Sequence, residues 1–404
     1  MAAKTQTLQF KQAVNAPPSE VYRAFTNSTA LREWLCHAAQ VEPRKGGRIH
    51  LWWNSGYYAT GEFTALVPNK KIAFTWLGRG EPGATSVQVS IAEKRGAAVV
   101  TLAHAGIGRG KAWARAIEEI GDGWQNSLAN LQSILETGWD LRFTRRPMLG
   151  INVGVFDAGV AAKLSVPVNE GILLDGVSEE MGAHAAGLKK GDVLVNIGGK
   201  KVTNWASLTG ALARHTAGDE VKVQFYRGGE KNALTVRLSP RPIDEPPATA
   251  AELAEAVRKM YADIDTQLAA AFEGVSEEEA SHKPGADEWS AKDVLCHLVA
   301  GERDWHAWIG ELIGSQERWS DDWAGNIALR HVGILAAFPT VPALLEELKR
   351  HEAETVGMLA ALPPEFVAHK GSYVRMAYSL LQAPEHVAGH RDQIRDAIAS
   401  ARKS

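Results

Sequence analysis

The stretch IEEIGDGWQNSLANLQSIL, residues 117–135, decides the architecture of the first third of the chain. Its large apolar side chains recur at spacings of three and four residues, which is the pattern of a long amphipathic helix. They are Ile117, Ile120, Trp124, Leu128, Leu131 and Leu135. This helix is therefore expected to lie across a sheet formed by the residues before it.

Upstream of this helix the sequence alternates between apolar and polar residues, as strands of a half-covered antiparallel sheet do. Three such runs lie at residues 49–53, 72–76 and 87–91. Another helix is expected to begin near Ala16-Pro17-Pro18-Ser19, since proline is tolerated in a first helical turn. The order helix, strands and long helix predicts an α+β domain over residues 1–145.

Several short motifs in this region resemble the SRPBCC superfamily, and most closely the branch named for the activator of the heat-shock ATPase. They are residues 16–26, Trp34-Leu35, Gly46-Gly47-Arg48, Gly61-Glu62-Phe63 and residues 123–128. The resemblance implies a helix-grip (START-like) fold with a pocket for a small apolar ligand between sheet and helix. Candidate pocket aromatics are Trp52, Trp53, Tyr57, Tyr58, Trp76 and Trp124, and four of them are assigned to the cavity: Trp53, Tyr58, Trp76 and Trp124. Alternatively, these rings only fill the core.

The stretch AHAAGLKKGDVLVNIGGKKV, residues 183–202, resembles PDZ domains of the bacterial HtrA type, and the resemblance covers residues 146–240. It implies a small, mostly-β domain. Asn204 is expected to cap a helix from Trp205 to about His215. PDZ modules of this type often accompany a serine protease, but the sequence contains no Gly-x-Ser-x-Gly elbow.

PDZ domains add an extended peptide to an open sheet edge and receive its terminal carboxylate on a loop of backbone N–H groups. By this resemblance the loop amides come from Leu149, Gly150 and Ile151, and the pocket for the last side chain is lined by Leu208 and Leu212. The implied partner is the C-terminal peptide of another protein. Alternatively, the domain is a spacer, or it binds a segment of its own chain.

A proline-rich stretch at residues 241–250 predicts a linker, and the remaining residues, 251–404, carry helical periodicity. Four amphipathic runs joined by moderate loops predict an all-α four-helix bundle. One run is expected to start at a Ser290 cap, and the last is expected over residues 378–398. The chain as a whole is therefore predicted to be multidomain.

Three histidines in this bundle are candidate metal ligands. His386 and His390 are four residues apart, which places them on one helix face, and His297 would approach from a facing helix. Such a set leaves an open coordination position and suits zinc or nickel. Packing without a metal is the alternative interpretation.

The same region, roughly residues 252–401, resembles the DinB family, including its thiol-transferase and maleylpyruvate-isomerase-like relatives. The motifs are Trp289-Ser290, His297-Leu298, and His386-x-x-x-His390 followed by Gln393-Ile394. The resemblance implies that the three histidines hold a divalent metal.

Other residues of the bundle give weaker signals. His306 is nine residues past His297, half a turn out of phase, and is expected to face elsewhere. His282, His331, His351 and His369 have no partner at ligand spacing. Glu302, Asp304 and Asp392 are near enough in sequence to orient a ligating ring, or else form a solvated helix face.

Composition excludes several classes of partner. With 44 Lys+Arg against 47 Asp+Glu there is no basic excess for nucleic acid or an anionic membrane. The first seven residues lack the apolar core of a signal peptide, and no apolar run is long enough to span a bilayer. Cys36 and Cys296 fall in different predicted domains, which argues against a disulfide framework. The expected location is the cytoplasm.

Two functional hypotheses follow. The first is a binding or adaptor protein for stress response or detoxification, with an apolar cavity, a peptide groove and a retained metal site. The alternative is a metal-dependent thiol S-transferase acting through the DinB-like bundle, in which the metal activates a thiolate. The first is favoured, because two of the three modules resemble families whose members mostly bind.

Overall fold

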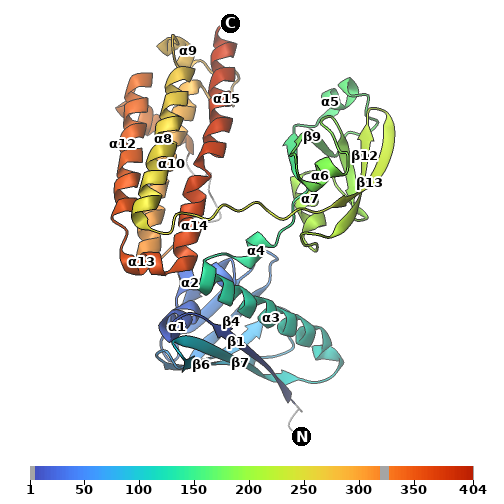
Figure 1. The fold of residues 1–404 in the computed structure, drawn as a ribbon, viewed down its shortest axis with the longest axis vertical. Coiled ribbons are helices and arrows are strands. Elements are labelled where there is room, and N and C mark those ends of the chain that lie inside the picture. The colour runs from blue at the N-terminus through green and yellow to red at the C-terminus, as the bar shows by residue number, and fades with distance from the viewer. Residues whose placement is uncertain (1–4, 319–326, 404) are drawn as a thin grey trace. The chain divides into compact units, whose positions relative to one another are not determined.

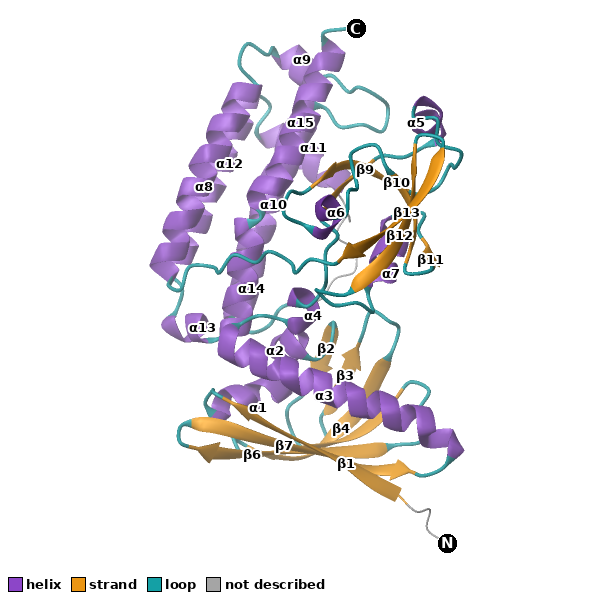
Figure 2. Cartoon of the chain, turned by 45° about the vertical axis from the view of Figure 1, so that its right-hand side comes forward, coloured by secondary structure: helices purple, strands orange, loops and turns teal. Residues whose placement is uncertain are grey.

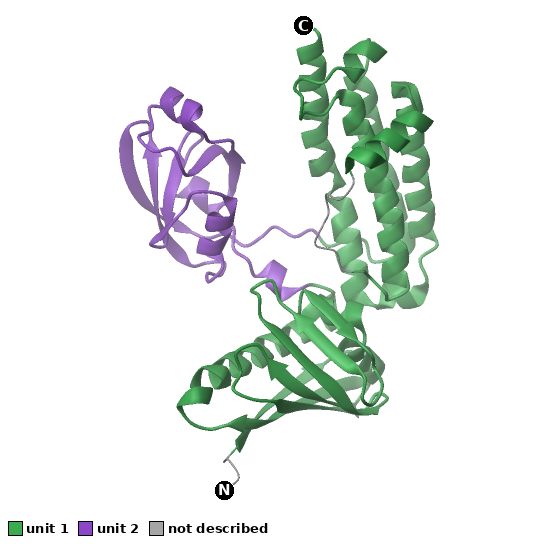
Figure 3. Ribbon diagram, turned by 180° about the vertical axis from the view of Figure 1, so that it is seen from behind, with its two compact units in different colours: residues 1–139, 245–404 green, residues 140–244 purple. Residues whose placement is uncertain are grey.

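The protein is represented by a computed structural model, which describes residues 5–318 and 327–403. Part of the stretch that suggested no signal peptide, residues 1–4, lies outside the described residues. The chain forms two compact units (Figure 3). One comprises residues 1–139 together with 245–404, and the other is the intervening segment 140–244.

The first domain of the larger unit is a seven-stranded antiparallel sheet with the order β1-β7-β6-β5-β4-β3-β2. Its strands are β1 (Thr5–Val14), β2 (Ala38–Val41), β3 (Arg48–Trp52), β4 (Tyr58–Val67), β5 (Lys71–Gly78), β6 (Thr85–Lys94) and β7 (Ala97–Gly108). The alternating runs of the sequence form β3, β5 and β6, and the predicted α+β class is confirmed.

The long helix α3 (Ala114–Thr137) follows a single 3-10 turn, η1 (Lys111–Trp113), and lies along the sheet (Figure 2). Its apolar stripe is buried at Ile120, Trp124, Leu128 and Leu131, as the spacing predicted. Two short helices precede the sheet's second strand: α1 (Pro18–Thr26), with proline in its first turn, and α2 (Ser28–Trp34), capped by the Asn27 side chain.

The smaller unit is a sheet with the order β13-β12-β10-β9-β8, to which β11 adds beside β10. The strands are β8 (Ile151–Gly154), β9 (Ile172–Val177), β10 (Val193–Ile197), β11 (Lys200–Lys201), β12 (Glu220–Arg227) and β13 (Glu230–Arg237). The helices are α4 (Leu141–Thr144), α5 (Ala158–Lys163), α6 (Gly182–Ala185) and α7 (Trp205–Leu212). Asn204 caps α7 as predicted, although the helix ends three residues before His215. Met148 and Ser239 exchange two backbone hydrogen bonds of 2.9 Å, which pair the beginning and the end of this unit.

The rest of the larger unit is all-helical, as predicted (Figure 1). Its helices are α8 (Ala250–Ala271), α9 (Glu277–Ser281), α10 (Ala291–Ile313), α11 (Ile327–Ala337), α12 (Val341–Ala360), α13 (Pro364–Ala368), α14 (Lys370–Leu381) and α15 (Ala383–Ala401). Ser290 caps α10. The run predicted as one helix over 378–398 is divided at Gln382, because Pro384 stands in the first turn of α15 and cannot continue the preceding helix.

Within the described ranges, no single helix is long and apolar enough to cross a bilayer. The bent pair Ile327–Ala337 and Val341–Ala360, with 108° between its members, meets the length and composition test only when taken together.

Polar contacts join the sheet domain to the bundle within the larger unit. Glu317 lies four residues after α10 ends at Ile313. Its carboxylate accepts a hydrogen bond from Arg375 at 2.7 Å and forms an ion pair with Arg32 at 3.1 Å. Its backbone N–H donates to Thr29. At the two ends of segment 140–244, the indole N–H of Trp139 donates to the carboxylate of Glu245 at 3.3 Å.

Candidate functional site

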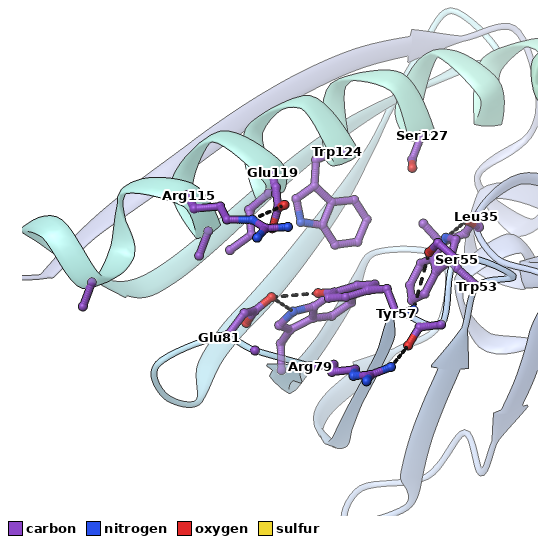
Figure 4. Close-up of a pocket in the computed structure, with 17 residues that line it drawn as sticks. Leu35, Trp53, Ser55, Tyr57, Arg79, Glu81, Arg115, Glu119, Trp124 and Ser127 are labelled. Atoms are coloured by element: carbon purple, nitrogen blue, oxygen red, sulfur yellow. Dashed lines mark hydrogen bonds and ion pairs between the residues drawn. The ribbon is translucent and has the colours of Figure 1, made fainter. Parts of the chain in front are cut away.

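A cavity of about 860 Å³ opens between α3 and the strands and loops around Trp53 and Glu81 (Figure 4). Three of the four aromatic residues assigned to the cavity, Trp53, Trp76 and Trp124, line it. The fourth, Tyr58, does not line it and is 40% exposed; its neighbour Tyr57 does line the cavity. Successive side chains of an extended segment point to opposite faces, so the choice of Tyr58 was in error by one residue.

The indole N–H groups of the cavity are all bonded within the protein. Trp53 donates to the Leu35 carbonyl at 2.7 Å, Trp76 donates to Glu81 at 3.0 Å, and Trp124 donates to His104 Nδ1 at 3.0 Å. These rings therefore offer apolar faces to the cavity. Such walls suit an apolar ligand whose binding buries ring surface.

His104 contacts two of the residues that line the cavity, Trp76 and Trp124, but does not line it itself. Because Trp124 donates to Nδ1, the proton of the neutral ring is on Nε2, which lies 2.7 Å from Thr85 Oγ1. That hydroxyl donates in turn to the Trp76 carbonyl at 3.1 Å. Burial lowers the pKa of His104 from 6.5 to about 4, so the ring is neutral at pH 7.

The cavity also has a charged side. The Tyr57 hydroxyl donates to Glu81 at 2.7 Å, and burial, together with this carboxylate, raises the pKa of Tyr57 well above its ordinary value. Gly78 makes room for the pair, since a Cβ at that position would lie 2.1 Å from the Tyr57 oxygen. Arg79, which donates to the Gly56 carbonyl, and the Arg115–Glu119 pair also line the cavity.

The predicted peptide site lies along β8, the edge strand of the smaller unit. Leu149 and Leu208 are buried, 3% exposed each, in the same core cluster against which Ile151 and Leu212 pack. Within the described part of the chain, the backbone N–H groups of Leu149 and Gly150 have no hydrogen-bond acceptor. Gly150 has a φ of +80°, which favours glycine. Exposed Val153 follows it in β8, and exposed Val155 lies just past the end of this strand at Gly154.

The three predicted metal ligands lie together in the bundle. His297 comes from α10, and His386 and His390 from successive turns of α15. One ligand atom from each lies within 4.8 Å of the others, and the Nε2 atoms of His386 and His390 are 2.9 Å apart. Trp289 packs on the His297 ring with centroids 5.2 Å apart and stacks on the His390 ring at 6.4 Å.

Burial affects the protonation of His297, and a hydrogen bond affects the tautomer of His390. Burial, followed by the neighbouring His390 and His386, lowers the pKa of His297 to about 4. His390 Nδ1 lies 3.0 Å from the Gln393 side-chain oxygen, and donation to that oxygen leaves the His390 Nε2 lone pair directed at the cluster. Neutral imidazoles so arranged fit a divalent zinc or nickel ion.

The orienting residue was not among the three acidic candidates. Glu302 instead bonds to Tyr261 and Thr355, Asp304 pairs with Arg330, and Asp392 pairs with neighbouring arginines on α15. Gln393 takes this position because it is three residues past His390, one helical turn away.

A second group with metal-ligand geometry was missed by the sequence analysis. It consists of His306 on α10 with His351 and Glu354 on α12. The spacing of three between His351 and Glu354 was the available signal, but nothing in the sequence indicated which helix would face them.

Comparison with known proteins confirms the predicted order of three modules. Residues 15–136 match the family described as activator of Hsp90 ATPase homolog 1-like protein, residues 147–238 match the PDZ domain, and residues 263–394 match the DinB superfamily. The chain is therefore a three-module protein with a large antiparallel-sheet domain, a PDZ domain and a DinB-like helical region.

Individual relatives share single portions of the chain. A probable periplasmic serine protease do/HhoA-like of Haemophilus influenzae is 32% identical over 114 residues, which is 28% of this chain and 24% of the relative. The activator of 90 kDa heat shock protein ATPase homolog 1 of Mus musculus is 29% identical over 105 residues, 26% of this chain and 30% of the relative. The crystal structure of an HSP90 activator from Plasmodium falciparum is 28% identical, covering 32% of this chain and 95% of that one, with a TM-score of 0.29. The chain thus spans about a quarter of the first of these curated relatives.

Proposed function

We propose that this protein is an adaptor whose PDZ domain binds the C-terminal peptide of a partner protein. The observation that carries the proposal is the pair of acceptor-less N–H groups at Leu149 and Gly150, located where the edge strand β8 begins. An incoming peptide would add to β8 as a strand and place its carboxylate on these amides. Leu208 and Leu212 of α7 would contact its last side chain.

The other modules would serve the same adaptor. The cavity of the sheet domain would hold an apolar small molecule against Trp53, Trp76 and Trp124. A role in stress response or detoxification is supported by the mouse relative, which is named as an activator of a heat shock protein's ATPase. We place the protein in the cytoplasm, where the buried thiols Cys36 and Cys296 would stay reduced.

Peptide binding can be tested with a library of peptides ending in a free carboxylate. Members with micromolar Kd are expected, and capping the terminus as a carboxamide should weaken them at least ~10-fold, because a charged acceptor is lost. Gly150→Ala should weaken binding similarly, since a Cβ there would lie 2.2 Å from Met181 Cβ at a φ of +80°. Gly210→Ala on α7, where a Cβ meets nothing within 4 Å, is the matched control. Equal affinity for acid and carboxamide peptides would contradict the proposal.

A second candidate function rests on the convergence of His297, His386 and His390. A divalent metal held by these rings would lower the pKa of a bound thiol, so that the thiolate attacks an electrophile. His386 is exposed, which leaves a side of the cluster open to substrate. Transfer of a thiol to an electrophile should then require metal and be lost in the double variant His386→Ala/His390→Ala. Metal content that stays unchanged in this variant would reject the transferase.

A further inference from the structure

The cluster of His306, His351 and Glu354 lies on a different face of α10 from the three-histidine cluster. His306 is nine residues past His297 and contacts α12, whereas His297 contacts α15. We propose that His306, His351 and Glu354 form a second binding site for a divalent transition-metal ion such as Zn²⁺.

The distances suit a metal after a small contraction. His306 Nδ1 and His351 Nδ1 each lie 3.8 Å from the same oxygen of Glu354, and one ligand atom from each residue is within 4.8 Å of the others. Ligand atoms around tetrahedral zinc are about 3.3 Å apart, given bonds of about 2.0 Å. The Glu354 side chain is 60% exposed, so its rotation can shorten both of its distances, while the two imidazole rings would have to turn toward each other.

Hydrogen bonds hold His306 with its Nδ1 lone pair toward the site. Its Nε2 lies 3.0 Å from the His351 carbonyl, which can only accept, so Nε2 carries the proton. The Thr355 hydroxyl, 2.9 Å from the same nitrogen, donates to Glu302 and therefore also accepts from His306. A backbone carbonyl behind the distal nitrogen is the usual support of a metal-binding imidazole.

His351 has an equivalent support in one of its two tautomers. Its Nε2 lies 3.0 Å from a carboxylate oxygen of Glu347, and donation to this oxygen leaves the Nδ1 lone pair toward Glu354. In the other tautomer Nε2 accepts from Arg303 Nε at 3.0 Å, and the proton on Nδ1 would be released when a metal binds there. His351 Nδ1 is buried and has no hydrogen-bond partner in the described part of the chain.

Without an ion, the Nδ1 lone pair of His306 faces the Glu354 carboxylate, and both groups are acceptors. A cation of charge +2 would bind both of them, together with His351, and so tie α10 to α12. Two imidazoles and one carboxylate leave coordination positions for water, on the side where Glu354 is exposed.

The test uses the full chain in the His386→Ala/His390→Ala background, which removes the other cluster. After treatment with chelator and dialysis, this protein is titrated with Zn²⁺ against a chromophoric chelator. One equivalent is expected to bind. Adding Glu354→Gln should weaken it at least ~10-fold, and Zn²⁺ should no longer raise the Tm.

Glu346→Gln is the matched control, since Glu346 is on the same helix and its side chain is 61% exposed. It should bind Zn²⁺ like the background protein. Absence of Zn²⁺ binding in the background protein, or equal binding by the Glu354 and Glu346 variants, overturns the proposal. The adaptor proposal is decided separately, by the peptide assay. The three-histidine proposal is decided by the metal content of the protein with both clusters intact.

Discussion

The tryptophan-lined cavity and the cluster of His297, His386 and His390 satisfy their polar groups in opposite ways. In the cavity, each indole N–H has a protein acceptor, and His104 is bonded at both ring nitrogens. In the cluster, two Nε2 atoms face each other at 2.9 Å and the pKa of His297 is lowered to about 4. A cavity completed internally suits an apolar ligand, whereas three imidazole rings turned toward one another suit a cation.

The largest expected effect is in the cavity wall. Trp124→Ala should lower the free energy of unfolding of the larger unit by about 3–5 kcal/mol, because a side chain only 4% exposed leaves a void and His104 loses its donor. Denaturant unfolding followed by circular dichroism measures it. Trp205→Ala, at a side chain 62% exposed, should change stability by less than about 0.5 kcal/mol. Equal effects of both substitutions would mean that Trp124 is not packed as described.

The next effect concerns metal at the three-histidine cluster. His390→Ala should weaken Zn²⁺ binding there roughly 100-fold, about 2.7 kcal/mol, because one of three ligands and the Gln393 contact are lost. Competition titration measures it in the Glu354→Gln background, so that one cluster is observed. The exposed His184 supplies the control, His184→Ala, which should bind like its parent. If Trp124→Ala weakened binding as much, the two regions would not be independent.

The smallest effect, taken at pH 5, is the acid response of His104. Its folded pKa of about 4 lies below 6.5, so between these pH values the unfolded chain binds more protons, and stability falls as the pH falls. By pH 5 the loss is about 2 kcal/mol, and it is complete below pH 4. An NMR titration of the His104 ring should show a midpoint near pH 4. A midpoint near 6.5 would show that burial does not keep the ring neutral.

Local patterns were enough to predict what depends on one element or one family resemblance. The α3 stripe, the alternating strands and the Asn204 and Ser290 caps follow from spacing within single segments. His386 and His390 share a helix face for the same reason, and His297 was added by resemblance to a family. Pro384 was visible as a break after Gln382 and was overlooked.

What escaped prediction depends on contacts between segments. Successive side chains of a strand point to opposite faces, so the choice between Tyr57 and Tyr58 depends on knowing the alternation at the start of β4. An error of one residue there exchanges the two side chains. Glu81 belongs to the cavity only because the turn after β5 returns its carboxylate to Trp76. His306 and His351 are 45 residues apart, and their meeting is set by how α10 packs on α12.

The hydrogen bond between Trp139 and Glu245 has a consequence for how the chain folds. It joins the two ends of residues 140–244, and the backbone pairing of Met148 with Ser239 keeps the ends of the inserted unit together as well. Once that unit has folded, the loop to be closed shrinks to about a dozen residues, which reduces the entropic cost of closure by about 2 kcal/mol. Folding of the inserted unit therefore brings residues 139 and 245 close together, which favours association of the two flanking parts of the larger unit. Unfolding of the inserted unit would raise the entropic cost of that association.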